Sequence, residues 1–191
     1  MLIKPGTTLE VVFKDVQQEV RRGVVDKKHP FRFITLATVQ NGIPEARYVV
    51  LRKIDEQFNF YLYTDARTTK VKAIQSNPLV SVLLYHPQKR VQVRVQASAM
   101  IHHKDSLASD HWIRVQGDAQ KAYNSILAPG EFISAPEQAY TWEEELSNAE
   151  NFAVVLLKPY KLDILQLNGL EHLRAAFNFT AEGWQGEWLV P

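Results

Sequence analysis

The sequence predicts a mainly β protein of 191 residues, built as an antiparallel barrel with helical additions. Three observations predict this class. Much of the chain beyond residue 30 alternates apolar and polar residues with the period of two that strands show. Turn-forming pairs such as Asn-Gly separate these segments, and helical spacing is confined to a few places. An α+β sandwich is the alternative that the same elements allow, and we expect a single domain over residues 1–191.

The first predicted element is a helix over residues 7–24. Thr7 or Thr8 can cap it, and Glu10 lies in the first turn, where the helix dipole favours an acid. Apolar residues recur at helical spacing and give one stripe for packing against a sheet. The stripe consists of Leu9, Val12, Phe13, Val16 and Val20.

Five strands are predicted next, over residues 31–39, 46–53, 60–64, 80–85 and 91–101. The turn 41-NGIP-44 joins the first two as a hairpin, because Asn-Gly suits the tight turn between antiparallel strands. A short helix connects the third strand to the fourth. It begins near Thr68 and ends at Asn77-Pro78.

The fifth strand separates its side chains by type. Val91, Val93, Val95 and Ala97 face one way, and Arg90, Gln92, Arg94 and Gln96 face the other.

Residues 105–150 are predicted to be mostly helical, with Thr141 capping a helix that starts in 142-WEEE-145. Strands return after this region. We expect them over residues 152–157, 161–167, 172–179 and 184–190, with turns at Asn168-Gly169 and Glu182-Gly183.

Composition narrows the function classes. The net charge of +1 offers no basic field for nucleic acid or a membrane surface. No segment approaches the ~20 apolar residues of a membrane span, and the N-terminal segment is a poor signal peptide because charges interrupt it. The absence of cysteine excludes disulfides and thiolate chemistry and fits a cytoplasmic location. We expect no metal site, since His102 and His103 are adjacent on a strand and point opposite ways.

A candidate anion site lies in 64-TDARTTK-70, where a strand becomes a helix. A helix N-terminus has unpaired N–H groups and a partial positive charge. Thr68 and Thr69 add hydroxyl donors, Lys70 adds a charge and Arg67 offers another. The combination suits a phosphate monoester, and the alternative is an ordinary helix cap beside a solvated lysine.

Two further polar residues stand out on strands. Arg47 shares a face with Val49 and Leu51, so it meets a carboxylate, a ligand phosphate or, at the strand end, solvent. Gln92 offers both a donor and an acceptor to a heteroaromatic ring, or belongs to an exposed alternating strand. No Ser–His–Asp arrangement, Walker loop or GxGxxG motif is present.

These elements occur in an order that resembles the pyridoxamine 5′-phosphate oxidase family of FMN-binding split-barrel proteins. The resemblance rests on 44-PEARYVVLRKID-55, 60-FYLYTDARTTKVKAIQSNPLVSVLLYHP-87 and 90-RVQVRVQASA-99. The end, 159-PYKLDILQLNGLEHLRAAFNF-179, is similar to the family's C-terminal segment.

The resemblance implies a Greek-key split β-barrel and a homodimer with FMN at the subunit interface. Arg47 and Lys70 would hold the FMN phosphate, with contacts from Thr68 and Thr69. Further implied flavin contacts are the backbone of Tyr48, Val49 and Val50, and the residues Tyr63, Thr64 and Gln92.

The chain also departs from the family's vitamin B6 enzymes. Thr69 stands where they carry an arginine, and Arg52 where they carry a lysine. Their flavin-stacking tryptophan is replaced by Leu165, and Arg174 is the stand-in for a C-terminal arginine. These differences resemble the family's shorter, uncharacterised branch more than the B6 oxidases proper.

The expected function is that of an FMN-binding oxidoreductase acting on a small molecule. Arg52 and Arg174 are the residues expected to hold an anionic substrate, because arginine matches phosphate and carboxylate geometry. No residue is assigned as a general acid or base. Two alternatives stay open, namely pyridoxamine 5′-phosphate oxidase itself and a non-enzymatic flavin carrier or redox sensor.

Overall fold

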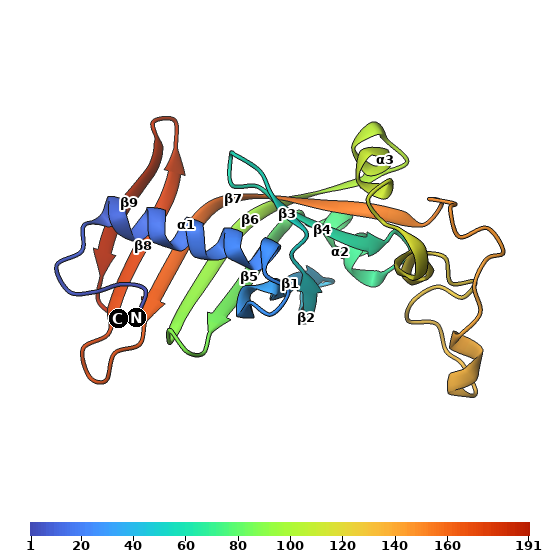
Figure 1. The fold of residues 1–191 in the computed structure, drawn as a ribbon, viewed down its shortest axis with the longest axis horizontal. Helices are drawn as coiled ribbons and strands as arrows, with labels where there is room; N and C mark the ends of the chain where they lie inside the picture. Colours follow the sequence, from blue (N-terminus) through green and yellow to red (C-terminus); the bar gives the residue numbers. More distant parts are fainter.

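A computed structural model describes residues 1–191, and Figure 1 shows an elongated molecule built around one twisted sheet. The helices are α1 (Leu9–Val25), α2 (Thr69–Ser76) and α3 (Ser106–Trp112), with 3₁₀ turns η1 (Pro30–Arg32), η2 (Gly117–Tyr123) and η3 (Pro136–Ala139). The strands are β1 (Phe33–Gln40), β2 (Ile43–Val50), β3 (Lys53–Ile54), β4 (Phe60–Asp65), β5 (Leu79–His86), β6 (Val91–His103), β7 (Phe152–Gln166), β8 (Leu173–Thr180) and β9 (Gly183–Leu189).

The nine strands form one antiparallel sheet in the order β2-β1-β5-β6-β7-β4-β3, with β8 and β9 added on the second half of β7. This confirms the predicted mainly β class with peripheral helices, although the sheet does not close on itself. The strand β2 pairs with β1 alone, so its other edge has no strand neighbour.

The hairpin predicted at Asn41-Gly42 is confirmed. Gln40 pairs with Ile43, and the two turn residues between them have φ angles of 52° and 78°. Two consecutive positive φ angles define the tight turn that matches the twist of antiparallel strands, which is why Asn-Gly is favoured there.

The prediction of separate strands over 152–157 and 161–167 is wrong, because β7 is one continuous strand of 15 residues. The long strand β6 pairs with both halves of β7. The pairing shifts by one residue between Gln96, which is opposite Lys161, and Ala97, which is opposite Pro159. The predicted strand over 46–53 instead divides into β2 and β3. It divides because Leu51 N–H bonds to Arg32 and Arg52 N–H bonds to Tyr61, so the chain changes partners at this corner.

The predicted helical region over 105–150 is also mostly wrong. Only α3 is α-helical, and 142-WEEE-145 forms no helix. Trp142 instead makes an isolated bridge to Ser125. Prolines at 129 and 136 and the lack of a sustained apolar stripe explain why no long helix forms here.

The helix α1 lies across one face of the sheet (Figure 1) and buries the predicted stripe residues Val12, Val16 and Val20. Phe13 packs on Phe177 and Trp184, with ring centroids 5.0 and 5.4 Å apart. The valines at 91, 93 and 95 on β6 are fully buried in the same core. The alternation predicted for this strand is therefore confirmed.

Glu19 fixes the middle of α1 to the sheet through a buried polar cluster. Its Oε1 lies 2.9 Å from His29 Nε2 and 3.3 Å from His86 Nε2. Its Oε2 lies 2.6 Å from Lys89 Nζ and 3.1 Å from Arg22 Nη1. Each carboxylate oxygen therefore has two partners, which offsets the cost of burying this charge.

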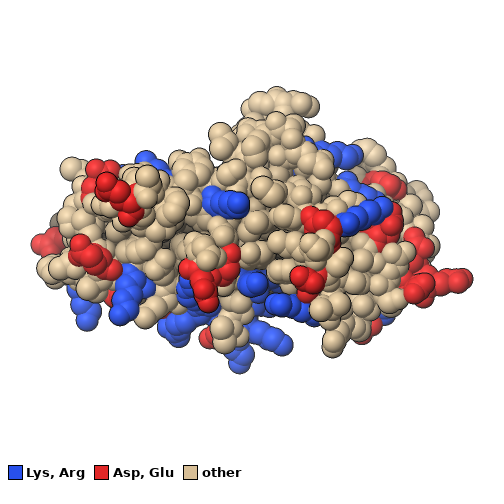
Figure 2. Space-filling view, turned by 90° about the horizontal axis from the view of Figure 1, so that it is seen from above, with Lys and Arg blue, Asp and Glu red and all other residues tan.

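Two features of the structure concern a membrane and charged partners. No helix of the structure is long and apolar enough to cross a membrane. Figure 2 shows acidic and basic side chains over the same face, with Lys and Arg gathered along its lower edge.

Candidate functional site

The candidate phosphate site is a hollow of about 490 Å³ between three segments of the chain. One wall is the middle of β2, the second is the N-terminus of α2, and the third is the loop at Pro129 and Gly130. The lining residues are Glu45, Ala46, Arg47, Thr68, Thr69, Lys70, Pro129 and Gly130. The fold therefore brings together Arg47, Lys70 and both threonines that were singled out separately in the sequence.

Lys70 is the half-buried cation of this hollow. Its Nζ donates to Thr64 Oγ1 over 3.0 Å, and no carboxylate lies within 4.0 Å of it. Burial lowers the pKa of Lys70, the Arg47 charge lowers it further, and Asp65 partly opposes both. A cation held this way gains from an anionic ligand.

The N-terminus of α2 keeps free donors. Thr68 is buried and occupies the cap position, but its hydroxyl donates to Asp65 O over 2.8 Å instead of capping the helix. The backbone N–H groups of Thr69 and Lys70 have no acceptor within the protein. These groups and the helix dipole suit an anion.

Arg47 lines the hollow but already has partners. Its Nη1 donates to Thr38 Oγ1 over 2.7 Å and to Leu36 O over 3.3 Å. Its Nη2 donates to Glu45 Oε2 over 2.6 Å. Of the outcomes expected for this arginine, the structure shows the carboxylate, and Glu45 is a site residue that the sequence reasoning missed.

Arg52 and Tyr63 lie together beyond this hollow. The Arg52 guanidinium carbon is 5.4 Å from the centroid of the Tyr63 ring, and Tyr63 Oη lies 2.9 Å from Nδ1 of the buried His111. Burial lowers the pKa of His111, and the charges of Lys53 and Arg114 lower it further. The imidazole is therefore neutral near pH 7 and can accept the Tyr63 proton in a hydrogen bond.

The backbone of Tyr48, Val49 and Val50 belongs to β2, whose outer edge is unpaired. Peptide groups on such an edge are available to a planar ligand with donors and acceptors along its rim.

The remaining candidates form a second group on β6, β7 and β8. Gln92 is directly opposite Leu165, and Leu165 is directly opposite Arg174, so the three lie in one row across the sheet. The Arg174 guanidinium donates to both oxygens of Asp163, over 3.1 and 2.8 Å, and Asp163 also accepts from Arg94. Arg174 is thus engaged by a carboxylate in this structure.

The two groups lie on opposite faces of the sheet. Arg47 is paired with Leu36 and Leu36 with Val82, and both of these partners face the core. Gln92 is paired with Tyr85, whose side chain is 47% exposed. Directly opposed residues share a face, so Gln92 lies on the outer face of the sheet while Arg47 lies on the face that also carries the core. One protomer does not bring the thirteen candidate residues into one place.

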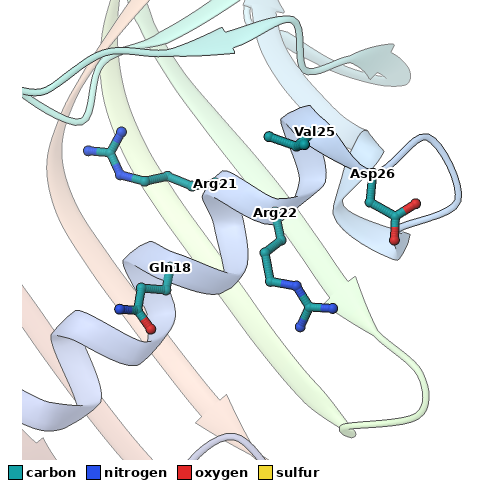
Figure 3. Close-up of a pocket in the computed structure, with 5 residues that line it drawn as sticks. All are labelled: Gln18, Arg21, Arg22, Val25 and Asp26. Atoms are coloured by element: carbon teal, nitrogen blue, oxygen red, sulfur yellow. The ribbon is translucent and has the colours of Figure 1, made fainter.

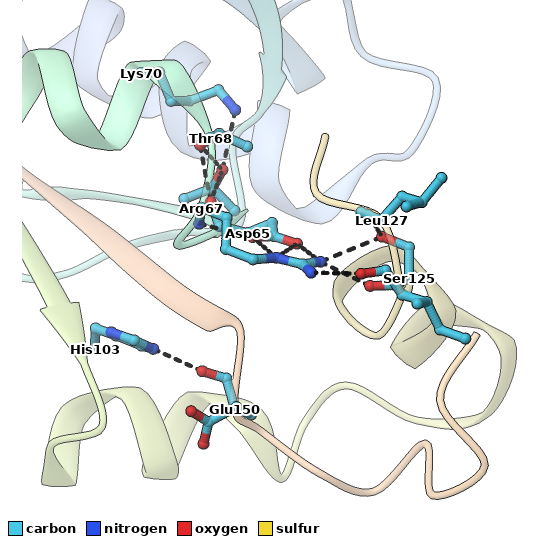
Figure 4. A network of polar contacts seen from close by, with 10 residues as sticks. Asp65, Arg67, Thr68, Lys70, His103, Ser125, Leu127 and Glu150 are labelled. Carbon is cyan, nitrogen blue, oxygen red and sulfur yellow. Dashed lines mark hydrogen bonds and ion pairs between the residues drawn. The ribbon is translucent and has the colours of Figure 1, made fainter. Parts of the chain in front are cut away.

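Arg67 is not a free phosphate ligand, contrary to the sequence expectation. Figure 4 shows its guanidinium between Asp65 and the segment around Ser125. It donates to Asp65 Oδ2 over 2.7 Å, to Ser125 O over 2.8 Å and to Ile126 O over 3.1 Å. The loop contacts could not be read from the sequence, because 58 residues separate Arg67 from Ser125.

Two other features of the structure resemble binding sites but lack the geometry of one. Glu19, His29 and His86 are residue types that bind metals, but Nδ1 of His29 accepts from Phe31 N–H and Nδ1 of His86 accepts from Lys89 N–H. The ring protons therefore sit on the Nε2 atoms that face Glu19, where a metal would need lone pairs.

A hollow of about 500 Å³ also lies on the exposed side of α1, beside Gln18, Val25 and Asp26. Figure 3 shows its two arginines, Arg21 and Arg22, pointing in different directions. They do not converge on a common ligand position.

The comparisons agree with this architecture. Residues 11–103 match the family described as pyridoxamine 5′-phosphate oxidase, FMN-binding domain. The pyridoxine/pyridoxamine 5′-phosphate oxidase of Legionella pneumophila is 34% identical over 71 residues, which span 37% of this chain and 33% of that protein. The corresponding protein of Streptomyces avermitilis is 27% identical over 185 residues, which span 92% of this chain and 72% of that protein.

Solved structures show the same fold. A pyridoxamine 5′-phosphate oxidase-related, FMN-binding protein from Nostoc punctiforme superposes with a TM-score of 0.78 at 22% identity, over 100% of both chains. PhzG from Burkholderia lata, in complex with tetrahydrophenazine-1-carboxylic acid, gives 0.77 at 16% identity, over 94% of this chain and 92% of that chain. Residues 11–103 of this chain therefore match the FMN-binding domain of the pyridoxamine 5′-phosphate oxidase family, and relatives and solved structures described with that family's name are similar to it over most of its length.

Proposed function

We propose that this protein binds FMN, with the flavin phosphate in the hollow between β2 and the N-terminus of α2. The observation that carries the proposal is the convergence of Lys70, Arg47 and the free N–H groups of Thr69 and Lys70 on one hollow. Lys70 has no carboxylate partner, so the donors fit a phosphate group. Thr68 and Thr69 add hydroxyl groups at the same wall.

The isoalloxazine ring would then extend along the free edge of β2, where the backbone of Tyr48, Val49 and Val50 can bond its rim. Tyr63 and Thr64 on β4 stand beside this path, since Thr64 already contacts Lys70 and Tyr63 contacts Arg52.

We further propose a homodimer with two FMN sites at its interface. Gln92, Leu165 and Arg174 lie on the sheet face opposite to Arg47, so a second copy is needed to bring such a row to the flavin. The same outer face exposes Phe33, Leu83 and Tyr85 by 57%, 37% and 47%. Neighbouring exposed apolar side chains of this size are typical of an interface.

When bound, FMN supplies two-electron redox chemistry, and the protein supplies position and charge. Arg52 is exposed and next to Tyr63, so it can hold the anionic group of a small substrate. Arg174 can do so once it is released from Asp163. We therefore assign an FMN-dependent oxidoreductase, and a cytoplasmic location is part of the same proposal.

Two other functions have support. Several relatives are named pyridoxine/pyridoxamine 5′-phosphate oxidase, which favours that activity for this chain as well. The altered positions Thr69, Leu165 and Arg174 favour a different substrate, or a flavin carrier without turnover.

The first test is the absorption spectrum of the purified protein, followed by titration with FMN. Lys70→Ala and Arg47→Ala should each weaken FMN binding by about 1.5–3 kcal/mol, as expected for a charge-assisted hydrogen bond. Lys72→Ala is the matched control, because Lys72 is exposed on the same helix and does not line the hollow. A colourless protein that binds no added FMN would refute the proposal.

Turnover assays then separate the three functions. Oxidation of pyridoxamine 5′-phosphate with O₂ identifies the named activity. Reduction of bound flavin by NAD(P)H, followed by transfer to a screened acceptor, supports another oxidoreductase. Bound FMN without either reaction supports a carrier or sensor.

A further inference from the structure

The loop that forms the third wall of the hollow is tied to the phosphate side by one side chain. Arg67 makes the hydrogen bonds to Ser125 O and Ile126 O, and Pro129 and Gly130 follow three to four residues later. Arg67 Nη2 also donates to Ser125 Oγ over 3.4 Å, and no residue other than Arg67 makes a hydrogen bond between residues 124–131 and the connection between β4 and α2. The remaining bonds of this segment, such as Ile126 N–H to Thr141 O, stay within the irregular region 117–150.

Arg67 is itself held firmly. The Asp65 side chain is only 2% exposed and accepts from Nε and Nη2 of Arg67, and from the Arg67 backbone N–H over 2.8 Å. A buried carboxylate that receives this fork fixes the direction of the guanidinium. The remaining N–H groups then point at the carbonyls of the loop (Figure 4).

The wall matters for the strength of the site. Lys70 and Arg47 attract a phosphate more strongly when less water surrounds the ions, because attraction scales inversely with the effective dielectric constant. Removing the wall at Pro129 and Gly130 would leave the hollow bounded by β2 and α2 alone. A displaced loop would therefore weaken binding of the phosphate more than binding of the flavin ring.

We propose that the Asp65–Arg67 pair is a positioning device, which holds the Ser125–Gly130 loop as a wall of the phosphate hollow and thereby sets the preference for FMN over riboflavin. The inference rests on the proposed FMN site. It assigns Arg67 no direct contact with the phosphate.

The test compares FMN and riboflavin affinities in Arg67→Lys. Lysine keeps the positive charge near the hollow, but a single ammonium group cannot serve Asp65 and two loop carbonyls together. We expect about a tenfold loss of FMN affinity with unchanged riboflavin affinity, the size of one or two lost hydrogen bonds. Hydrogen exchange of residues 124–131 should rise in the same variant.

A second variant, Gly130→Ala, keeps the test decisive if Arg67→Lys fails to fold. Gly130 has φ of +97°, which an alanine adopts only with strain, while the added methyl group meets no atom within 4 Å. It should disturb the wall without touching Arg67 and give the same selective loss. Arg21→Lys on α1 is the matched control and should change neither affinity.

The outcomes are distinguishable. A wild-type protein that binds no FMN overturns both the proposed function and this inference. A wild-type protein that prefers FMN, with an unchanged FMN-to-riboflavin ratio in the folded variants, overturns the inference alone.

Discussion

Glu45 Oε2 lies 2.6 Å from Arg47 Nη2, so the arginine that is proposed to hold the FMN phosphate is already paired with a carboxylate. The pair is partly solvated, since the side chains are 47% and 21% exposed, and such a pair contributes little stability. The main effect of the pair is that Glu45 competes with the FMN phosphate for Arg47. The Glu45 charge also repels an incoming phosphate.

Glu45→Gln should therefore bind FMN more tightly, by about 1.4- to fivefold, which corresponds to the ~0.2–1 kcal/mol of an exposed ion pair. Titration by quenching of flavin fluorescence measures this change. Glu56→Gln, at an exposed residue outside the hollow, is the control and should have no effect. Equal or weaker FMN binding by Glu45→Gln would contradict the competition.

Lys70 predicts a pH dependence of FMN binding. Its pKa lies below the usual 10.5 because of burial and the nearby Arg47 charge. As pH rises through this lowered pKa, the ammonium loses its proton and the attraction for phosphate declines. FMN affinity should therefore fall on the alkaline side, and Lys70→Arg should remove the decline because arginine keeps its charge. Parallel profiles for both proteins would exclude Lys70 as the titrating group.

The proposed dimer predicts that a charge on the outer face of the sheet separates the subunits. Leu83 is directly opposite Arg94 on β6, in the next row of outward residues to Gln92. Leu83→Asp should weaken dimerisation at least about tenfold, because burying a carboxylate is costly and its cross-strand neighbour Arg94 is already engaged by Asp163. Light scattering after gel filtration measures the mass. Leu170→Asp is the control, since Leu170 is fully exposed in the turn between β7 and β8. A Leu83→Asp protein that stays dimeric would place the interface elsewhere.

Local signals predicted those parts of the structure that depend on neighbouring residues. The Asn41-Gly42 hairpin, the α1 stripe and the alternation along β6 each follow from turn geometry or side-chain period. The cluster at the phosphate hollow could be proposed because each residue is of a type that binds phosphate, which a sequence shows directly. Its members are Arg47, Thr68, Thr69 and Lys70. The predictions that were wrong concern features that depend on contacts between residues far apart in the sequence. The strand β7 is continuous because β6 supports both of its halves, and Arg67 is engaged by carbonyls of a loop that follows 58 residues later.

The same limit applies to the cluster under α1, which only the fold assembles. Glu19, His29 and His86 come from three separate segments, and no local pattern indicates that they meet. Two predictions for the pH dependence of stability follow, one from the carboxyl group of Glu19 and one from the imidazole of His86.

The pKa of Glu19 lies below the usual 4.5. Burial alone would raise it, but the hydrogen bonds from Lys89 and His29 and the charges of Lys89 and Arg22 outweigh that effect. A carboxyl with a lowered folded-state pKa stabilises the fold above pH 4.5, and this contribution is lost as pH falls through the folded-state value. The free energy of unfolding should therefore drop below about pH 4.5, at which unfolded carboxyl groups titrate.

His86 predicts an earlier loss of stability on acidification. Burial lowers its pKa below the usual 6.5; the charge of Glu19 opposes this shift, while His29, Lys89 and Arg22 reinforce it. Its Nδ1 already accepts the Lys89 N–H, so a second proton on the ring would break that hydrogen bond. The unfolded state therefore binds the proton more readily, and the free energy of unfolding should fall as pH drops below 6.5.

His86→Asn tests this assignment because the Asn side-chain oxygen can still accept from Lys89 N–H but does not titrate. At pH 7 the variant should lose about 0.5–1.5 kcal/mol, because it removes the polar contact of His86 Nε2 with Glu19 Oε1 over 3.3 Å. Between pH 6.5 and 5 its free energy of unfolding should decline less steeply than that of the wild type, as measured by urea denaturation. Some slope should remain, because burial also lowers the pKa of His111. His103→Asn, at an exposed residue on β6, should keep the wild-type slope. If His86→Asn also keeps it, then proton uptake by His86 does not destabilise the fold.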